Sequence, residues 1–229
     1  MNFNNPKIKL NKKDLAKNIR FPTRMSVELA ELIGIHLGDG SINKSCKSTY
    51  TISYTGNLKH DKEYMFYINE LFKKIFNAKL SISINKKKNS YELRIRSKSL
   101  CQFMNIYLKL PFGRKTNLKI PSYIKNDPIY LKAFLKGLFD TDGCVTIQRQ
   151  GKYAYSLVKI CTKSKKFADE ISTSFHSLNI PSFICKKRWK DFIGYDVVVR
   201  NRNIKKFFRI INSNNSRKIY KYHRILNKL

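Results

Sequence analysis

The sequence predicts an α+β protein built from two copies of one αββαββα unit, and three observations lead to this expectation. Segments about one hundred residues apart resemble each other along most of the chain. Each copy shows the same succession of helical and strand-like patterns. The 229 residues, of which 42% are hydrophobic, suffice for two small domains that share a core.

The repeat is clearest around Asp39 and Asp142, which lie 103 positions apart. The segment ending at Gly40 reads SVELAELIGIHLGDG, and the one ending at Gly143 reads IYLKAFLKGLFDTDG. At offsets of 107 and 104 positions, TGNLKHDKEY resembles TKSKKFADEI and YELRIRS resembles YDVVVRN. Nearly constant offsets over most of the chain indicate two copies of one unit.

The repeat also predicts the domain boundaries. Between the copies, KLPFGRKTNLKIPSYIKNDP is rich in Pro, Gly and Lys and lacks periodicity, so it is expected to be a linker. We expect the lysines of both tails to contact phosphate or to stay solvated. The expected segments are a basic N-terminal extension (1–24), a first half-domain (25–108), the linker (109–128), a second half-domain (129–211) and a basic C-terminal tail (212–229).

Each copy is expected to begin with a helix. Ser26 is a suitable N-cap, and Gly40 and Gly143 stand where a left-handed C-terminal cap is common. Strands are expected next, because residues 50–55, 80–85 and 91–96 alternate apolar and polar side chains. An amphipathic helix separates the first of these strands from the second. The alternating strands therefore predict a sheet that has helices against one face and an open second face.

The charge of the chain favours a polyanionic partner. The formal net charge is +32, from 47 basic and 15 acidic residues. Nucleic acid is the expected partner of so basic a protein. The basic residues run through the whole chain, which argues against a membrane-surface helix.

Other functional classes find no support in the sequence. The five cysteines form no CxxC pair and no HExxH motif occurs, so neither a zinc site nor a disulfide framework is expected. We expect a cytoplasmic or organellar protein, because the sequence shows neither a secretion signal nor an apolar run of membrane-spanning length.

Small residues recur on the first helix of each copy. Ala30 and Gly34 are four positions apart, and so are Ala133 and Gly137. Residues at this spacing lie along one ridge of a helix, and small ones let another helix come close. We therefore expect the two helices to pack on each other about a pseudo-twofold axis, with these four residues at their interface.

Such a pairing would bring Asp39 and Asp142 together at the C-terminal ends of the two helices. Unsatisfied carbonyl groups and the negative ends of the helix dipoles gather there. Two carboxylates repel each other in that setting unless a cation lies between them, and oxygen ligands favour Mg²⁺ or a similar ion. A single Asp-Gly pair after an apolar helix is most often an ordinary turn. Its occurrence at equivalent positions of two repeats favours the metal site.

The segments LIGIHLGDG and LKGLFDTDG resemble two copies of the LAGLIDADG motif, and the resemblance extends over residues 25–210. It points to monomeric, two-motif homing endonucleases, with archaeal intron-encoded members the most similar. It implies that Asp39 and Asp142 bind metal, assisted by the carbonyl groups of Gly38 and Thr141. It also implies a saddle of antiparallel sheets on the major groove of long double-stranded DNA, and breaks that leave short 3′ overhangs.

The resemblance further implies Mg²⁺ or Mn²⁺ as cofactor, with Ca²⁺ binding but not supporting efficient cleavage. It places a catalytic basic residue after the strand that precedes the amphipathic helix, which is Lys163 in the second copy. Its counterpart in the first copy is Gly56, so we expect the two DNA strands to be cut at different rates. A plain phosphate contact is the alternative for Lys163. Asp140 has Leu37 as its counterpart, so it cannot have a role shared by both halves, and we expect a solvated or supporting carboxylate.

The alternation of the strands predicts which side chains face the DNA. In residues 91–96 the apolar side chains take every second position, so Arg94 and Arg96 point to the open face. Arginine forks and amides suit base edges, whereas any single basic residue can equally well contact phosphate or remain solvated. The candidate DNA contacts are Ser41, Asn43, Lys44, Ser81, Ser83, Asn85, Lys86, Arg94, Arg96, Gln148, Arg149, Lys159, Lys186, Arg188, Lys190 and Arg200.

Three functions remain open at this point. The first is a sequence-specific, metal-dependent DNA endonuclease, which the presence of both acidic residues favours. The second is a non-cleaving nucleic-acid binder of the same fold, such as an RNA maturase or a transcription regulator. The third, a ribosomal-type RNA-binding protein, explains the charge but not the repeated Asp-Gly helices.

Overall fold

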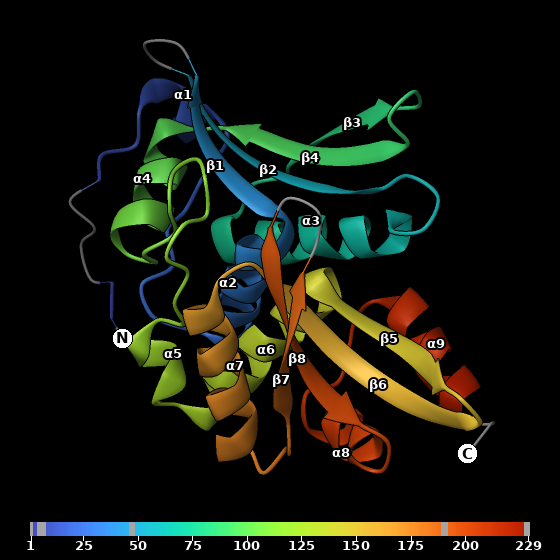
Figure 1. The fold of residues 1–229 in the computed structure, drawn as a ribbon. Helices are drawn as coiled ribbons and strands as arrows, with labels where there is room; N and C mark the ends of the chain where they lie inside the picture. Colours follow the sequence, from blue (N-terminus) through green and yellow to red (C-terminus); the bar gives the residue numbers. More distant parts are fainter. Residues whose placement is uncertain (1, 4–7, 46–48, 189–191, 227–229) are drawn as a thin grey trace. The chain divides into compact units, whose positions relative to one another are not determined.

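The computed structural model describes residues 2–3, 8–45, 49–188 and 192–226 (Figure 1). The chain divides into two compact units, Met1–Lys115 and Thr116–Leu229, and this division falls inside the expected linker. Each unit contains one four-stranded antiparallel sheet with helices, in the order αββαββα. The expected α+β class and the two similar halves are confirmed.

The first unit contains helix α2, which carries the first motif, and a sheet of strand order β1-β2-β4-β3. Helix α3 contacts α2 and β2, and helix α4 contacts β2. The aromatic ring of Phe3 packs edge-on against Phe103 of α4, so the N-terminal extension belongs to the unit. Its elements are α1 (Lys12–Ala16), α2 (Val27–Asp39), β1 (Gly40–Ser45), β2 (Thr49–Asn57), α3 (Lys62–Phe76), β3 (Ser81–Asn85), β4 (Ser90–Arg96) and α4 (Lys98–Ile106).

The strand register of the first unit separates its two faces. Ile52 pairs with Ile95 and Tyr54 with Leu93, and all four side chains are buried in the core. The residues between them on β2 and β4 are polar or charged and point to the opposite face. One apolar and one polar face follow from the alternation, as the sequence predicts.

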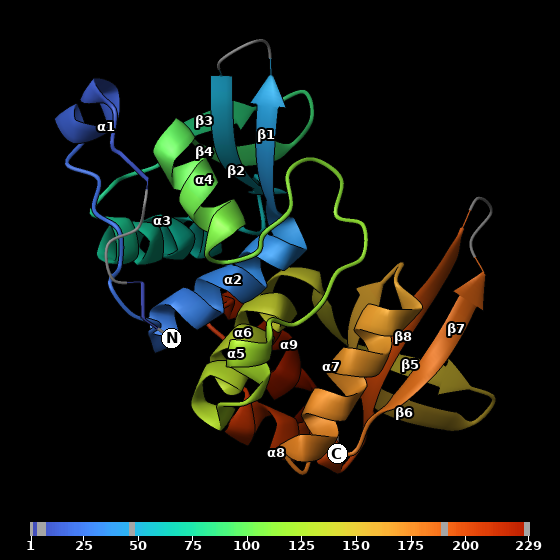
Figure 2. The ribbon, with the colours of Figure 1, turned by 90° about the vertical axis from the view of Figure 1, so that its left-hand side faces the viewer.

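The second unit repeats the plan, with strand order β5-β6-β8-β7. Figure 2 shows α7 alongside this sheet, and α6, α7 and α8 all contact it. Its core contains the rings of Phe139, Phe175 and Phe207, which meet edge to face. Its elements are α5 (Ser122–Lys125), α6 (Pro128–Asp142), β5 (Gly143–Gln150), β6 (Tyr153–Thr162), α7 (Lys165–Ser177), β7 (Phe183–Arg188), β8 (Ile193–Arg200), α8 (Asn203–Ile210) and α9 (Ser216–Leu226).

The two motif glycines do not form left-handed caps, so that expectation was wrong. Gly40 and Gly143 both have φ −82° and ψ 160°, an extended conformation open to any residue. Each turns the chain directly from the helix into a strand. A Cβ atom at Gly143 would collide with the ring and carbonyl oxygen of Phe139, and one at Gly40 would collide with His36. Close approach to the last helical turn, not backbone conformation, therefore requires glycine at both positions.

Candidate active site and nucleic-acid interface

The two motif helices begin differently and end alike. Ser26 accepts a hydrogen bond from the amide of Leu29 at 3.1 Å, which confirms it as the N-cap of α2. Asp127 caps α6 through the amides of the first helical turn. The last residues, Asp39 and Asp142, are both exposed, and the residues before them are both half-buried. Each unit thus presents one carboxylate to solvent in an equivalent local setting.

A lysine is hydrogen-bonded to the C-terminal carbonyl groups of each motif helix. In the first unit, Lys115 donates to the carbonyl oxygen of Leu37 at 3.0 Å and also to that of Gly38. In the second unit, Lys218 donates to the carbonyl oxygen of Thr141 at 3.1 Å and also to that of Phe139. Helix C-termini attract cations because their last carbonyl groups lack partners within the helix.

Sequence reasoning missed this lysine pair, although a signal existed. Lys115 and Lys218 lie 103 positions apart, the same offset that relates Asp39 to Asp142. Lys115 lies in the presumed linker and Lys218 in the presumed tail, so neither was compared with the other. Lys218 is only 2% exposed, so the expectation of solvated or phosphate-bound tail lysines is wrong at this position.

Asp140 is buried and fastens the C-terminal segment to the second motif helix. Its carboxylate accepts hydrogen bonds from the hydroxyl of Ser213 at 2.5 Å and the amide of Asn214 at 2.7 Å. The side-chain amide of Asn215 donates to the carbonyl oxygen of Asp140 at 3.1 Å. The expectation of a solvated carboxylate is therefore wrong. This anchor leads directly into α9, which carries Lys218.

His36 is buried in the last part of α2 and is neutral. Its Nδ1 lies 3.3 Å from the hydroxyl of Tyr54. Burial and the nearby charge of Lys115 lower the pKa of His36 to about 3. A neutral, buried imidazole belongs to the core of the first unit and is not a candidate general base.

Lys163 follows β6 at the predicted position, and its ammonium lies 4.1 Å from the ring centroid of Phe192. Gly56 lies within β2. A Cβ atom at Gly56 would come within 2.9 Å of the sulfur of Met65 in α3. A side chain at this position would require Met65 to move. The catalytic role of Lys163 remains a prediction.

The four residues expected at the helix interface are all buried. Ala30 is 0% exposed and Ala133 is 6% exposed, and Gly34 and Gly137 are also buried. Their packing against the other motif helix remains a prediction.

In the first unit, most of the candidate DNA contacts lie on the polar face of the sheet. Arg94 on this face is held by Glu92, whose two carboxylate oxygens each lie 2.9 Å from its Nη2. Lys44 shares the opposite face with Ile42, and its ammonium lies 5.6 Å from the ring centroid of Tyr50. Lys86 follows β3 in a turn. The candidates on the polar face are Ser41, Asn43, Ser81, Ser83, Asn85, Arg94 and Arg96.

In the second unit, the register separates the candidate contacts into two groups. Gln148, Lys159 and Arg200 lie on the polar face. The guanidinium of Arg200 stacks between the rings of Tyr155 and Phe183, at 4.9 and 5.0 Å from their centroids.

Three other candidates lie on the opposite, apolar face of the sheet, and their contact with DNA remains a prediction. Arg149 shares its face with buried Val145, while Lys186 and Arg188 share theirs with Ile184. A shift of one residue in a strand moves a side chain to the opposite face of the sheet. Lys187, which was not among the candidates, takes the position on the polar face. Lys190 lies outside the described residues.

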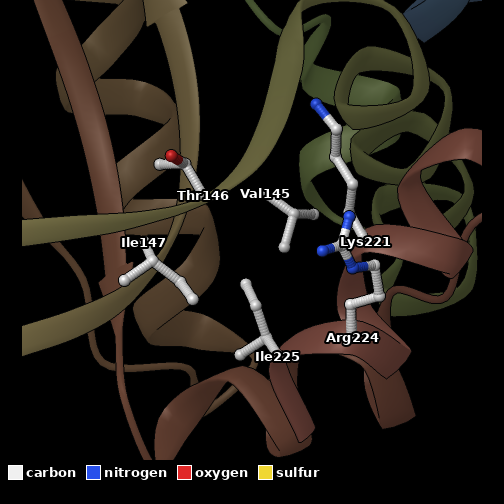
Figure 3. Close-up of a pocket in the computed structure, with 6 residues that line it drawn as sticks. All are labelled: Val145, Thr146, Ile147, Lys221, Arg224 and Ile225. Atoms are coloured by element: carbon white, nitrogen blue, oxygen red, sulfur yellow. The ribbon is translucent and has the colours of Figure 1, made fainter. Parts of the chain in front are cut away.

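A pocket of about 250 Å³ lies between β5 and α9 of the second unit. Figure 3 shows the side chains that line it. Ile225 of α9 faces the aliphatic side chains of β5, and Lys221 and Arg224 form the charged rim. No residue of either motif helix lines this pocket, so it is distinct from the carboxylates at the helix ends. Its lining residues are Val145, Thr146, Ile147, Lys221, Arg224 and Ile225.

Both halves of the chain match models of known families. Residues 29–106 match the family model described as a WhiA LAGLIDADG-like domain. Residues 130–212 match the model described as a LAGLIDADG-like domain. The chain belongs to the LAGLIDADG family, with one such domain in each unit.

Curated relatives share part of their length with this chain. An uncharacterised protein of Methanocaldococcus jannaschii is 30% identical over 180 residues, which cover 74% of this chain and 62% of the relative. A replication factor C small subunit of the same organism is 29% identical over 203 residues, covering 87% of this chain and 10% of the relative. A DNA polymerase of Thermococcus hydrothermalis is 33% identical over 127 residues, which are 55% of this chain and 7% of the polymerase. The chain thus spans less than two thirds of the length of each.

Solved structures with the same fold include two homing endonucleases. I-DmoI in complex with DNA and Mn matches with a TM-score of 0.58 at 22% identity, covering 81% of this chain and 96% of the other. The meganuclease I-SmaMI, bound to uncleavable DNA, matches with a TM-score of 0.55 at 15% identity, covering 85% and 88%. Among the described residues, none of the helices has the length and apolar character needed to cross a membrane.

Proposed function

We propose that this protein is a homing endonuclease, which hydrolyses both strands of a specific DNA site in a metal-dependent reaction and leaves short 3′ overhangs. One observation carries the proposal most directly. Each unit presents an exposed carboxylate, Asp39 or Asp142, at the end of its motif helix. A lysine is bound to the carbonyl group just before each carboxylate.

We propose that the residues at the two helix ends bind a divalent cation. No cluster of three His, Cys, Asp or Glu side chains occurs within the described residues. A metal ion would therefore depend on few protein ligands. We propose that these are the carboxylates of Asp39 and Asp142 and the carbonyl oxygens of Gly38 and Thr141, each of which has a second lone pair besides the one that its lysine engages. Oxygen ligands of this kind suit Mg²⁺ or Mn²⁺, which leave positions for water and for phosphate oxygens. When bound, such an ion lowers the pKa of water and stabilises the leaving oxygen.

The lysines can assist the same chemistry from the protein side. An ammonium bound to the carbonyl groups at the end of each motif helix can stabilise negative charge that develops on a phosphate in the transition state. Lys115 and Lys218 offer this positive charge to both halves, the buried Lys218 without direct contact to phosphate, whereas Lys163 offers it to one. We therefore propose the lysine pair as the basic component of the site. The expected difference between the cleavage rates of the two DNA strands then depends on how much Lys163 contributes to charge stabilisation at the nearer phosphate.

Long double-stranded DNA is the proposed substrate, read in the major groove by the polar faces of the two sheets. The strands of these faces carry hydroxyl, amide and guanidinium groups, which suit base edges. One chain contains two copies of the unit, so a monomer can in principle address both halves of a site.

A second function, a non-cleaving nucleic-acid binder, is favoured by one observation. The first domain matches a WhiA LAGLIDADG-like model. Such a binder does not need acidic residues at both helix ends. The presence of both Asp39 and Asp142 favours the endonuclease.

A library of supercoiled plasmids with a randomised insert distinguishes these functions. The protein is incubated with the library in Mg²⁺, and linear products are sequenced at their ends. The endonuclease predicts one family of cut sites with 3′ overhangs, and no linear product when EDTA replaces Mg²⁺. Enrichment of bound sequences without any cleavage would support the binder instead.

A further inference from the structure

Four polar side chains form a row across all four strands of the second sheet. Gln148 Oε1 on β5 accepts a hydrogen bond of 3.4 Å from Lys159 Nζ on β6. Lys159 Nζ lies 3.8 Å from Asp196 Oδ2 on β8. The same carboxylate oxygen lies 2.7 Å from Lys187 Nζ on β7. One carboxylate thus orders two lysines and, through Lys159, an amide.

Asp196 is an unusual residue for this surface. It is 3% exposed and Lys159 is 8% exposed, although both lie on the polar face of the sheet. Burial acts to raise the pKa of Asp196, but hydrogen bonds from Cys161 and Lys187 and the charges of both lysines hold it below the usual range. The group is therefore ionised at neutral pH. A fixed negative charge repels DNA phosphates, so it weakens binding that depends on charge alone.

The first sheet has a carboxylate at the equivalent position. Glu92 and Asp196 lie 104 positions apart, as do the strands that carry them. Glu92 binds the Nε and Nη2 groups of Arg94. Both carboxylates belong to an inner strand, β4 or β8, and both hold a basic side chain of the same face. The same pairing of an inner-strand carboxylate with a basic side chain occurs in both sheets although their sequences have diverged. This repetition argues that the pairing has a function.

We propose that Asp196 and Glu92 are positioning residues for the recognition of DNA sequence. Each fixes the direction of neighbouring donors, so that their remaining N–H groups meet acceptors on base edges such as guanine O6 and N7. The exposed Lys187 acts this way in the second unit and Arg94 in the first, while the buried Lys159 holds Gln148. The carbonyl oxygen of Gln148 is engaged by Lys159, which leaves its NH₂ group free to donate. Fixing these side chains beforehand reduces the entropy that sequence-specific binding would otherwise cost. The assignment rests on the proposed DNA-binding function.

The test measures base preference separately from affinity. The wild-type chain and Asp196→Asn are each used to select from a duplex pool with a randomised segment, in EDTA to prevent cleavage. Loss of the charge should raise affinity for random duplex roughly two- to fivefold at low salt. It should also weaken discrimination at one or two base pairs of one half-site by roughly tenfold, the size of one good base contact. Glu92→Gln should do the same in the other half-site.

Two further variants serve as controls. Asp169→Asn removes the same charge from α7, where Asp169 forms an ion pair with Lys165, and should leave all base preferences unchanged. Lys187→Met changes an exposed partner of Asp196 and leaves the buried carboxylate in place. It should weaken discrimination at the same base pairs as Asp196→Asn, even if the latter folds poorly.

The outcomes separate this inference from the proposed function. Unchanged base preferences in both Asp196→Asn and Lys187→Met would overturn the positioning role while leaving the endonuclease intact. A wild-type chain that enriches no sequence from the pool would overturn the proposed function and the positioning role together.

Discussion

At the scale of single residues, the candidate site is defined by the groups around two helix ends. Asp39 and Asp142 follow from the sequence alone, because their repeat and the residues beside them are visible there. Lys115 and Lys218 do not, because each reaches its helix from a segment more than seventy residues away. Local patterns carry no information on such contacts. Only the repeat offset links the two lysines.

Replacing each lysine tests its role in cleavage. Lys115→Met and Lys218→Met leave helix carbonyl groups without a donor, so each should lower the free energy of unfolding by about 1–3 kcal/mol. If the lysines serve the nearer phosphate, each variant should also slow the breakage of one strand, and the two variants should affect opposite strands. Strand-specific end labelling on a supercoiled plasmid measures this. Lys221→Met is the control, and equal slowing of both strands by either variant would contradict the local role.

The neutral state of His36 predicts a dependence of stability on pH. Its pKa in the folded state is about 3, below the ordinary value of 6.5. The unfolded chain therefore binds a proton that the folded chain does not, and stability falls as pH drops below 6.5. From pH 6.5 to pH 5 the loss from this residue should be about 2 kcal/mol. Urea denaturation across this range should show a weaker pH dependence in His36→Gln than in the wild type, and no change in the surface control His60→Gln.

At the scale of helices and strands, the sequence predicts the order of elements well and the details of side-chain direction less well. Alternation identified the polar face of β4, which is long and regular. It gave no face for Arg149, Lys186 and Arg188, because the end of a hydrophobic pattern does not reveal which polar residue continues the pleat. Helix α9 was taken for a tail because it is strongly basic. Its buried side, including Lys218, becomes apparent only from the anchor at Asp140.

The motif glycines give a prediction at this scale. Gly143→Ala adds a methyl group that collides with the backbone and ring of Phe139, without any strain in φ. The free energy of unfolding should therefore fall by about 1–3 kcal/mol, as in other overpacked sites. Chemical denaturation measures the change. A variant as stable as the wild type would show that the helix end relaxes easily and that close approach does not explain the glycine.

At the scale of the whole molecule, charge and duplication are the dominant features, and both are plain in the sequence. The net charge of +32 predicts strong, salt-sensitive binding to DNA. Many contacts to phosphate release many counterions, so the slope of log affinity against log salt should be on the order of −5 or steeper. Titration of a labelled duplex between low and moderate salt measures this slope. A nearly flat dependence would exclude an extended DNA-binding surface.

The central claim is that the two carboxylates at the motif helix ends carry metal-dependent cleavage. The most direct measurement follows plasmid cleavage against Mg²⁺ concentration for the wild type, Asp39→Asn and Asp142→Asn, on a site recovered from the library. The account predicts that neither variant forms linear product at any Mg²⁺ concentration. Both should bind the duplex at least as tightly as the wild type, because each loses a negative charge near phosphate, and both should melt at the wild-type temperature. Cleavage at the wild-type rate by either folded variant would contradict the account.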